Sequence, residues 1–337
     1  MRRTKLLLTG ALVAVLAACG LEPASQSVPD VQGGPELAEF DNLGEAPIVT
    51  TSKDFTEQLI LGKMLSLVLK AKGADVADHT NTKGSVNARE TILNGSSDIA
   101  WEYTGTAWLV YMGHSDVDPK TSEAGGVKIS DPEALYEAVK KADLKDNDVV
   151  WGDPAPFNNT YAMAIKEDQA KQKDANGKTI DVKSLSDLAK LPPDKQTYCL
   201  ENEFENRPDG WPGMQQAYDI DVPKDNVTIM DTGVIYSRIG GGSCLAGEVF
   251  DTDGRIPANG LRTLEDDKGY FPIYEPAVTI REEIHKKHPQ IVQMFNKLGS
   301  KLSTETMRRL NAEVDVDGRD PLDVAREWLV DEGFLKN

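Results

Sequence analysis

Residues Ser97 to Thr106 read SDIAWEYTGT, and the apolar run AWLVYMG follows them directly. The segment SDIAWE has the length and apolar character of a short buried strand, and the later run has the character of a helix. Between the two runs, residues 103–106 supply a phenol, a glycine and two hydroxyl groups. In open α/β sheets, ligands bind beyond the strand ends, where the helices begin. The stretch therefore predicts an α/β fold with polar and aromatic side chains placed for binding.

Strand-like and helix-like segments alternate along most of the chain, which also favours an α/β architecture. The expected strands cover residues 46–52, 97–102, 148–152, 160–165, 196–200, 226–231, 247–251 and 270–280. The expected helices cover residues 54–73, 85–95, 131–143, 182–190, 282–302, 303–314 and 321–333. Asp54 or Thr56 is expected to cap the first of these helices, and Gly73 to end it.

The N-terminus reads as an export signal. Three basic residues precede the apolar run 6–18, which is short for a membrane span. Its end, Leu16-Ala17-Ala18-Cys19, resembles the lipobox of bacterial lipoproteins, which implies cleavage before Cys19 and a lipid on its sulfur. The alternative is an ordinary secretory signal with a chance cysteine. We expect a signal peptide at 1–18, a flexible tether at 19–45 rich in Pro, Gly and Ser, and anchoring at the outer face of the cytoplasmic membrane.

The remaining length, about 290 residues, exceeds a usual single core, so two lobes are expected. Two Pro- and aromatic-rich segments, near residues 156 and 272, are natural crossings between them. The predicted lobe I comprises residues 46–157 and 268–337, and lobe II comprises residues 158–267. An excursion into a second lobe and back would form a double hinge.

The formal net charge is −18, and no basic patch stands out, which argues against a nucleic-acid partner. After Cys19 only two cysteines remain, Cys199 and Cys244. In an exported chain this number suggests one disulfide, although two buried free thiols would also account for it.

The familiar enzyme motifs are missing from the sequence, including the nucleophile elbow, the phosphate-binding loop and the zinc-binding helix. His285 and His288 lie one helical turn apart, but a solvated helix face explains them better than a metal site. Asp251 and Asp253 could in principle act as an acid–base pair, although solvated or structural carboxylates are the default in so acidic a chain. We therefore expect no enzyme activity, no cofactor and no metal.

Four aromatic residues stand in polar, turn-like places at strand ends or crossings: Tyr103, Tyr161, Phe250 and Tyr274. Taken singly, each could be an ordinary core residue. Together they would suit a quaternary ammonium group, because such a cation has no N–H to donate and ring faces attract it.

The sequence resembles the substrate-binding lipoproteins of osmoprotectant ABC importers, from about Ile48 to Leu335. The motifs that carry the resemblance are KDFTEQLILGKML (53–65), DIAWEYTGTAW (98–108), PFNNTYAMAI (156–165), DTDGRI (251–256) and FPIYEPAVTI (271–280). The resemblance implies a bilobal type II periplasmic-binding-protein fold. It also implies a monomeric receptor that captures glycine betaine, choline or carnitine in an aromatic cage and delivers it to an ABC permease.

The resemblance further implies particular site residues. Three cage tyrosines match Tyr103, Tyr161 and Tyr274, whereas the fourth falls on Phe250, which keeps the ring face but lacks the hydroxyl. Glutamine and threonine positions that bind the ligand carboxylate match Gln58 and Thr106, although Gln58 could instead be a capping residue. Two further polar candidates are the latch residue Arg207 and the neighbour of the second tyrosine, Asn159.

Two other functions remain open from the sequence. The same fold could receive another solute, such as an amino acid or ectoine, with Arg or Lys in place of rings at the cleft. An envelope enzyme that uses the pair Asp251 and Asp253 is the third possibility.

Overall fold

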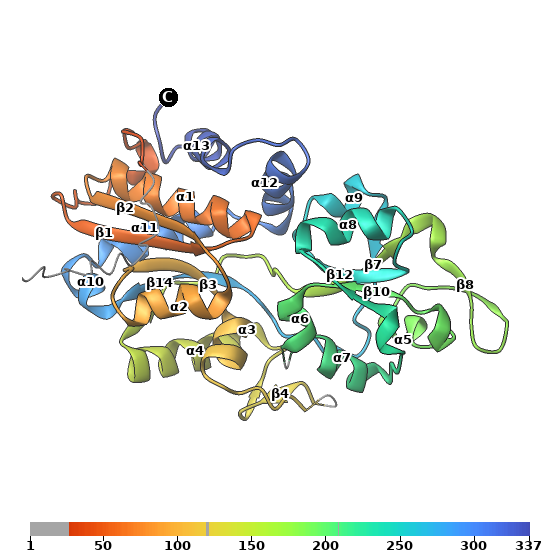
Figure 1. Cartoon of the computed structure of the whole chain (residues 1–337). Coiled ribbons are helices and arrows are strands. Elements are labelled where there is room, and N and C mark those ends of the chain that lie inside the picture. Colours follow the sequence, from red (N-terminus) through yellow and green to blue (C-terminus); the bar gives the residue numbers. More distant parts are fainter. Residues whose placement is uncertain (1–26, 119–120, 208) are drawn as a thin grey trace, which may run out of the picture.

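The computed structural model describes residues 27–118, 121–207 and 209–337, and it contains two α/β lobes, each built on a five-stranded sheet (Figure 1). This arrangement confirms the predicted bilobal α/β fold. The expected signal peptide, Cys19 and the first part of the tether lie outside the described residues. The later part of the predicted tether is not a free coil: Gly33 pairs with Leu335, and Leu37 and Leu43 are buried in the first lobe. In the part of the chain that the structure describes, no helix is long and apolar enough to cross a membrane.

The first sheet has the strand order β2-β1-β3-β14-β6. Its strands are β1 (Pro47–Lys53), β2 (Asp75–Thr82), β3 (Ile99–Tyr103), β6 (Val149–Trp151) and β14 (Pro276–Arg281). The helices of this lobe are α1 (Thr56–Ala71), α2 (Ser85–Leu93), α3 (Thr104–Thr106), α4 (Pro132–Asn147), α10 (Glu282–Lys287), α11 (Gln290–Gly299), α12 (Thr304–Asp315) and α13 (Pro321–Asp331). A π-helical turn, Ala107–Tyr111, continues α3, and a small hairpin joins β4 (Glu123–Ala124) to β5 (Val127–Lys128).

The second sheet has the order β11-β10-β12-β7-β13. Its strands are β7 (Tyr161–Lys166), β10 (Tyr198–Leu200), β11 (Val227–Ile229), β12 (Ala246–Phe250) and β13 (Leu261–Thr263). Around it lie α5 (Leu185–Leu188), α6 (Asn202–Asn206), α7 (Trp211–Tyr218), α8 (Thr232–Gly240), α9 (Arg255–Ala258) and the hairpin β8 (Lys171–Lys173) to β9 (Thr179–Asp181). The two sheets thus share one spatial arrangement of strands, although the antiparallel strand comes last along the chain in the first sheet and first in the second. The sequence has no detectable internal repeat.

In each sheet, one strand that follows a crossing runs against its neighbours. β7 pairs antiparallel with β12, and β14 pairs antiparallel with β3, whereas β1–β2 and β10–β11 are parallel pairs. The register places Phe250 opposite Tyr161, and Pro276 opposite Tyr103. The starts of the returning strands therefore lie at the same sheet edge as the ends of the parallel strands. The chain passes between the sheets at residues 152–160 and 264–275, while the lobe boundaries themselves stay a prediction.

The start of α1 differs from the expectation. Its N-cap is Phe55, which makes no side-chain cap, so neither predicted cap is correct. Asp54 accepts a hydrogen bond from the Gly84 amide instead, and Thr56 donates to Asp315. Gly73 does follow the end of α1, in the left-handed conformation that glycine adopts without strain. Strands β2 and β13 and the two hairpins were not predicted.

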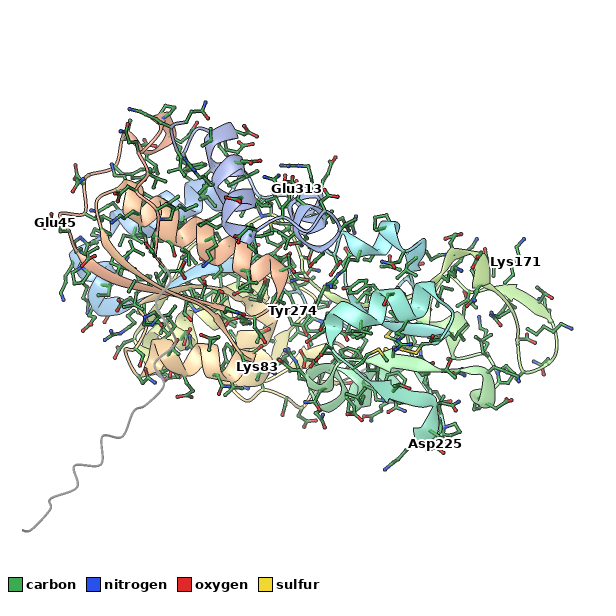
Figure 2. The ribbon with its side chains drawn as sticks, turned by 45° about the horizontal axis from the view of Figure 1, so that its top comes forward. Glu45, Lys83, Lys171, Asp225, Tyr274 and Glu313 are labelled. Carbon is green, nitrogen blue, oxygen red and sulfur yellow. A yellow bond between two sulfur atoms is a disulfide. The ribbon has the colours of Figure 1, made fainter. Side chains whose placement is uncertain are left out.

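Cys199 and Cys244 form a disulfide inside lobe II, which confirms the predicted pairing (Figure 2). Cys199 is the middle residue of β10, and Cys244 lies just before β12. Both are buried next to Ile235 and Ile239 of α8. The bond closes a segment with a sequence separation of 45 that contains α6, α7, β11 and α8.

We predict that replacing both cysteines by serine lowers the free energy of unfolding of lobe II by roughly 4 kcal/mol, because the unfolded chain regains the entropy of the open loop. Urea unfolding followed by tryptophan fluorescence measures the effect. Reduced wild-type protein serves as the control and should behave like the double variant. An unchanged midpoint in both samples would contradict the prediction.

Candidate functional site

One cavity of about 580 Å³ lies between the lobes, and its walls come from both sheets and both crossings. Tyr274, which Figure 2 labels at the junction of the lobes, is part of its wall. Seven of the eight predicted binding residues line it: Tyr103, Thr106, Asn159, Tyr161, Arg207, Phe250 and Tyr274. The eighth, Gln58, does not.

The predicted aromatic residues gather around this cavity. The ring of Tyr161 lies 5.3 Å from that of Phe250 and 5.6 Å from that of Tyr274, measured between centroids. Burial raises the pKa of the Tyr103, Tyr161 and Tyr274 phenols well above the usual value, so all three are neutral. The cavity therefore offers uncharged ring faces.

A fifth ring, Phe55, completes the aromatic wall, and the sequence analysis missed it. Its centroid lies 5.5 Å from that of Phe250 and 6.2 Å from that of Tyr103, so it bridges the two lobes. The signal that singled out the other four also applied to it, because Phe55 stands between a strand and a helix start in a polar stretch. From the sequence alone, this stretch is interpreted only as helix caps and the candidate Gln58, and Phe55 is given no role.

Arg207 lies behind two of the rings. Its guanidinium carbon is 5.4 Å from the centroid of Tyr161 and 6.0 Å from that of Tyr274. It holds Asp209 through two bonds, of 2.9 and 2.6 Å, and Asp209 also accepts the hydroxyl of Tyr274. Burial by itself would raise the pKa of Asp209, but the Arg207 charge and these hydrogen bonds outweigh it and hold that pKa below its usual range. Arg207 thus packs behind two rings, and the carboxylate of Asp209 balances its positive charge.

The lysine at the opposite wall is also paired. Lys53 Nζ lies 2.6 Å from Glu102 Oε1 and 4.9 Å from the ring centroid of Tyr103. Glu102 additionally accepts the amide of Tyr103 and the hydroxyl of Tyr111. Glu102 therefore stabilises the local turn and neutralises Lys53, and it does not line the cavity.

Gln58 points away from the cavity. Its Oε1 accepts the amide of Lys53 at 3.3 Å, and its side chain borders a second, very small cavity against the first sheet, next to Arg89 and Trp101. Gln58 and Glu57 are adjacent on α1, so their side chains differ by about 100° around the helix axis. The structure turns Glu57 toward the ligand cavity and Gln58 toward the sheet.

The lobes also touch beside the cavity. Ser85 of α2 donates to Glu203 Oε1 at 2.9 Å, and Arg308 of α12 donates to the Asp251 carbonyl at 2.8 Å. Gly254 packs so closely on Ala312 that a Cβ atom there would lie 2.5 Å from the alanine Cβ. Glycine at this position lets α12 lie directly against lobe II.

The two carboxylates considered for acid–base chemistry are engaged separately. Asp251 lies 3.0 Å from Arg308, and Asp253 forms an ion pair with Arg255. The pKa of Arg255 is raised despite its burial, because Asp253 accepts its hydrogen bonds. The first pairing joins α12 to lobe II, and the second lies within lobe II, so each carboxylate has its own cationic partner.

The family model described as the substrate binding domain of ABC-type glycine betaine transport systems matches residues 46–331. The chain belongs to this family. Its members are solute-binding components of ABC transporters, which fits a cavity between two lobes. Binding of a solute for such a transporter is therefore the function of this chain.

Individual relatives agree with the family. The glycine-betaine-binding protein of Pseudomonas aeruginosa is 34% identical over 291 residues, covering 84% of this chain and 87% of the relative. The ergothioneine transport permease/ergothioneine binding protein of Helicobacter pylori is 33% identical over 286 residues, covering 85% of this chain and 47% of that longer one. A solved structure of a glycine betaine/carnitine/choline ABC transporter protein is 28% identical, with a TM-score of 0.67, and covers 85% of this chain and 98% of its own.

We predict that Arg207→Met lowers the free energy of unfolding by about 3–5 kcal/mol, because it leaves the Asp209 carboxylate buried without its cation. Adding Asp209→Asn to that variant should recover part of the loss, since the uncompensated charge is then gone. The wild-type contribution should be present at neutral pH and fade as pH falls through the lowered pKa of Asp209. Urea unfolding of the single and double variants measures the coupling, and additive effects would contradict it.

Proposed function

We propose that this protein captures a small quaternary ammonium solute of the osmoprotectant type, such as glycine betaine, choline or carnitine, and delivers it to an ABC permease. The observation that supports the proposal most directly is the aromatic wall: five rings from both lobes and the second crossing line one cavity. A quaternary ammonium group has no N–H and cannot donate a hydrogen bond, but the faces of aromatic rings attract its positive charge. Its relatives include a glycine-betaine-binding protein, which agrees with this ligand class.

The expected affinity follows from the number of rings. Each ring contributes about 0.5–2 kcal/mol to the binding of a desolvated cation. Four or five such contacts, with hydrogen bonds to the rest of the solute and the loss of rigid-body freedom, are compatible with a micromolar Kd, about −8 kcal/mol.

The polar end of the solute would lie against the start of α2 and the hydroxyl group of Thr106. The cavity wall includes the first residue of α2, Ser85, and the last residue of α3, Thr106. Unpaired amide groups and the helix dipole favour a carboxylate or hydroxyl there. Asn159 is less suited to this role, because its amide already donates to Glu57 at 2.8 Å.

A receptor for an ordinary amino acid is the less favoured alternative. Such a site would use a free arginine or lysine for the ligand carboxylate. Three of the four basic side chains that line the cavity are paired with carboxylates: Arg207 with Asp209, Lys53 with Glu102 and Arg255 with Asp253. The fourth, Lys83, is exposed to solvent.

We also propose that the chain is tethered to the outer face of the cytoplasmic membrane through a lipid on Cys19. The support for this proposal is the lipobox-like sequence that ends at Cys19, behind basic and apolar runs. Only the part of the tether before Gly33 would be free to extend, because Gly33 pairs with Leu335, and Leu37 and Leu43 are buried in the first lobe. We propose that the receptor acts as a monomer and has no catalytic role.

We predict that wild-type protein, freed of co-purified ligand, binds at least one trimethylammonium compound with micromolar Kd and does not bind proline. Tyr161→Ala should weaken this binding by at least about tenfold, because it removes the ring that contacts the two other cage rings. Isothermal titration with glycine betaine, choline, carnitine, ergothioneine, ectoine and proline measures both results.

Tyr161→Phe is the matched control for this experiment, since it keeps the ring face, and we expect its affinity to stay close to wild type. Wild-type affinity in Tyr161→Ala would overturn the cage assignment. If the wild-type protein bound none of the trimethylammonium compounds in the panel, the proposed ligand class would be wrong.

We predict that Cys19→Ser moves the full-length chain from the membrane fraction to the soluble extracytoplasmic fraction, because the sulfur that would carry the lipid is lost. Fractionation of a bacterial host, with mass spectrometry of the mature N-terminus, measures the change. Membrane association that persists in the variant would contradict the lipid anchor.

A further inference from the structure

Glu57 is a buried carboxylate in the cavity wall that the proposed function does not yet use. It is the second residue of α1, and only 2% of its surface is exposed. Its oxygens accept the Tyr103 hydroxyl at 2.7 Å and the side-chain amides of Asn159 at 2.8 Å and Asn311 at 3.3 Å. One carboxylate thus gathers donors from the end of β3, from the first crossing and from α12.

The donors to Glu57 are all neutral, which distinguishes it from the other buried carboxylate of this wall. Among the described residues that line the cavity, Asp253 is equally buried but forms an ion pair with Arg255. A buried carboxylate with no cationic partner carries a large desolvation penalty, which a nearby cation relieves. Because Glu57 lines the ligand cavity, a cation bound there can be its positively charged partner.

The balance of charge around the cavity points the same way. Its lining contains seven acidic side chains, Asp54, Glu57, Glu201, Glu203, Asp231, Asp253 and Asp315, and four basic ones, Lys53, Lys83, Arg207 and Arg255. A cavity with more acidic than basic groups favours a positively charged occupant over a neutral one of the same shape.

We propose, on the basis of the function proposed above, that Glu57 is the counter-charge of the bound cation and the residue that makes this site select for charge. It acts in two ways from one position. Its own negative charge attracts the ammonium group, and by accepting the Tyr103 hydroxyl it makes that ring more electron-rich. The aromatic wall then selects for methyl groups and shape, while Glu57 selects for positive charge.

Glu57 can do this only in its ionised form, so binding is linked to pH. Burial raises the pKa of Glu57, against the hydrogen bonds that it accepts. Its titratable hydrogen-bond partner is Tyr103 on β3. Other charged groups that line the same cavity on neighbouring elements are Asp315 on α12, Asp253 and Arg255 after β12, and Lys53 on β1. A bound cation favours the ionised carboxylate, so affinity should fall as pH is lowered through the raised pKa, and binding in that range should release a proton.

The test compares choline with its uncharged carbon analogue, 3,3-dimethyl-1-butanol, by isothermal titration and competition. Wild-type protein should prefer choline strongly. Glu57→Gln, which keeps the size of the side chain, should weaken choline binding by roughly 10- to 100-fold and leave binding of the carbon analogue nearly unchanged. Glu57→Asp, which keeps the charge, should restore part of the preference.

Glu133→Gln is the matched control. Glu133 is likewise the second residue of its helix, α4, but faces solvent outside the cavity. This variant should keep the wild-type preference. An equal choline preference in wild type and Glu57→Gln would overturn the inference while leaving the proposed function intact, whereas a wild-type protein that binds no quaternary ammonium compound would overturn the proposed function itself.

The wild-type chain provides a second readout, which also decides the matter if Glu57→Gln does not fold. Titration of choline in buffers of different ionisation heat, between about pH 4.5 and pH 7.5, counts the protons released on binding. Proton release within this range supports the inference. No release anywhere in this range would overturn it.

Discussion

The two crossing segments are hydrogen-bonded to each other, and the position of the whole site depends on this pairing. The Asn159 amide donates to the Tyr274 carbonyl at 3.1 Å, and the Tyr274 amide donates to Asn158 Oδ1 at 2.7 Å. Each crossing then enters a sheet as a strand that runs against its neighbour, β7 beside β12 and β14 beside β3. Tyr161 is the first residue of one returning strand, and Tyr274 lies two residues before the other. Both are thereby fixed where the two sheets face each other.

This constraint explains why the aromatic positions could be predicted from the sequence. The end of β3, the end of β12 and the two crossings can each be recognised from alternating apolar runs and Pro-rich linkers. In an α/β fold with a returning antiparallel strand, these points meet at one edge. Tyr103, Phe250, Tyr161 and Tyr274 were therefore found from local patterns, together with a resemblance that spans most of the chain.

The beginning of α1 was predicted poorly, and the reason is geometric. Phe55, Glu57 and Gln58 are close in sequence, but a helix turns successive side chains by about 100°. Which of them faces the cavity depends on how α1 packs on the sheet, and Gly62 sets that packing, because a Cβ there would lie 2.6 Å from Thr80. Sequence patterns predict the helix and its period, but they do not show which side of the helix faces the cavity. Gln58 was therefore chosen as a binding residue, and Phe55 and Glu57 were missed.

The paired ions of the cavity wall show how a binding site can be highly charged and still depend on rings. Lys53, Arg207 and Arg255 each hold a carboxylate, so their charges largely cancel at the distance of a bound solute. Among the buried lining groups outside these pairs, the ring faces and the carboxylate of Glu57, whose partners are neutral, can discriminate between solutes. Since Asn159 and Asn311 bring the first crossing and α12 to the same carboxylate, a change in its charge reaches the aromatic wall and the contact between the lobes together. The inferred counter-charge of the cation is thus also the group that holds the first crossing and α12 beside the cavity.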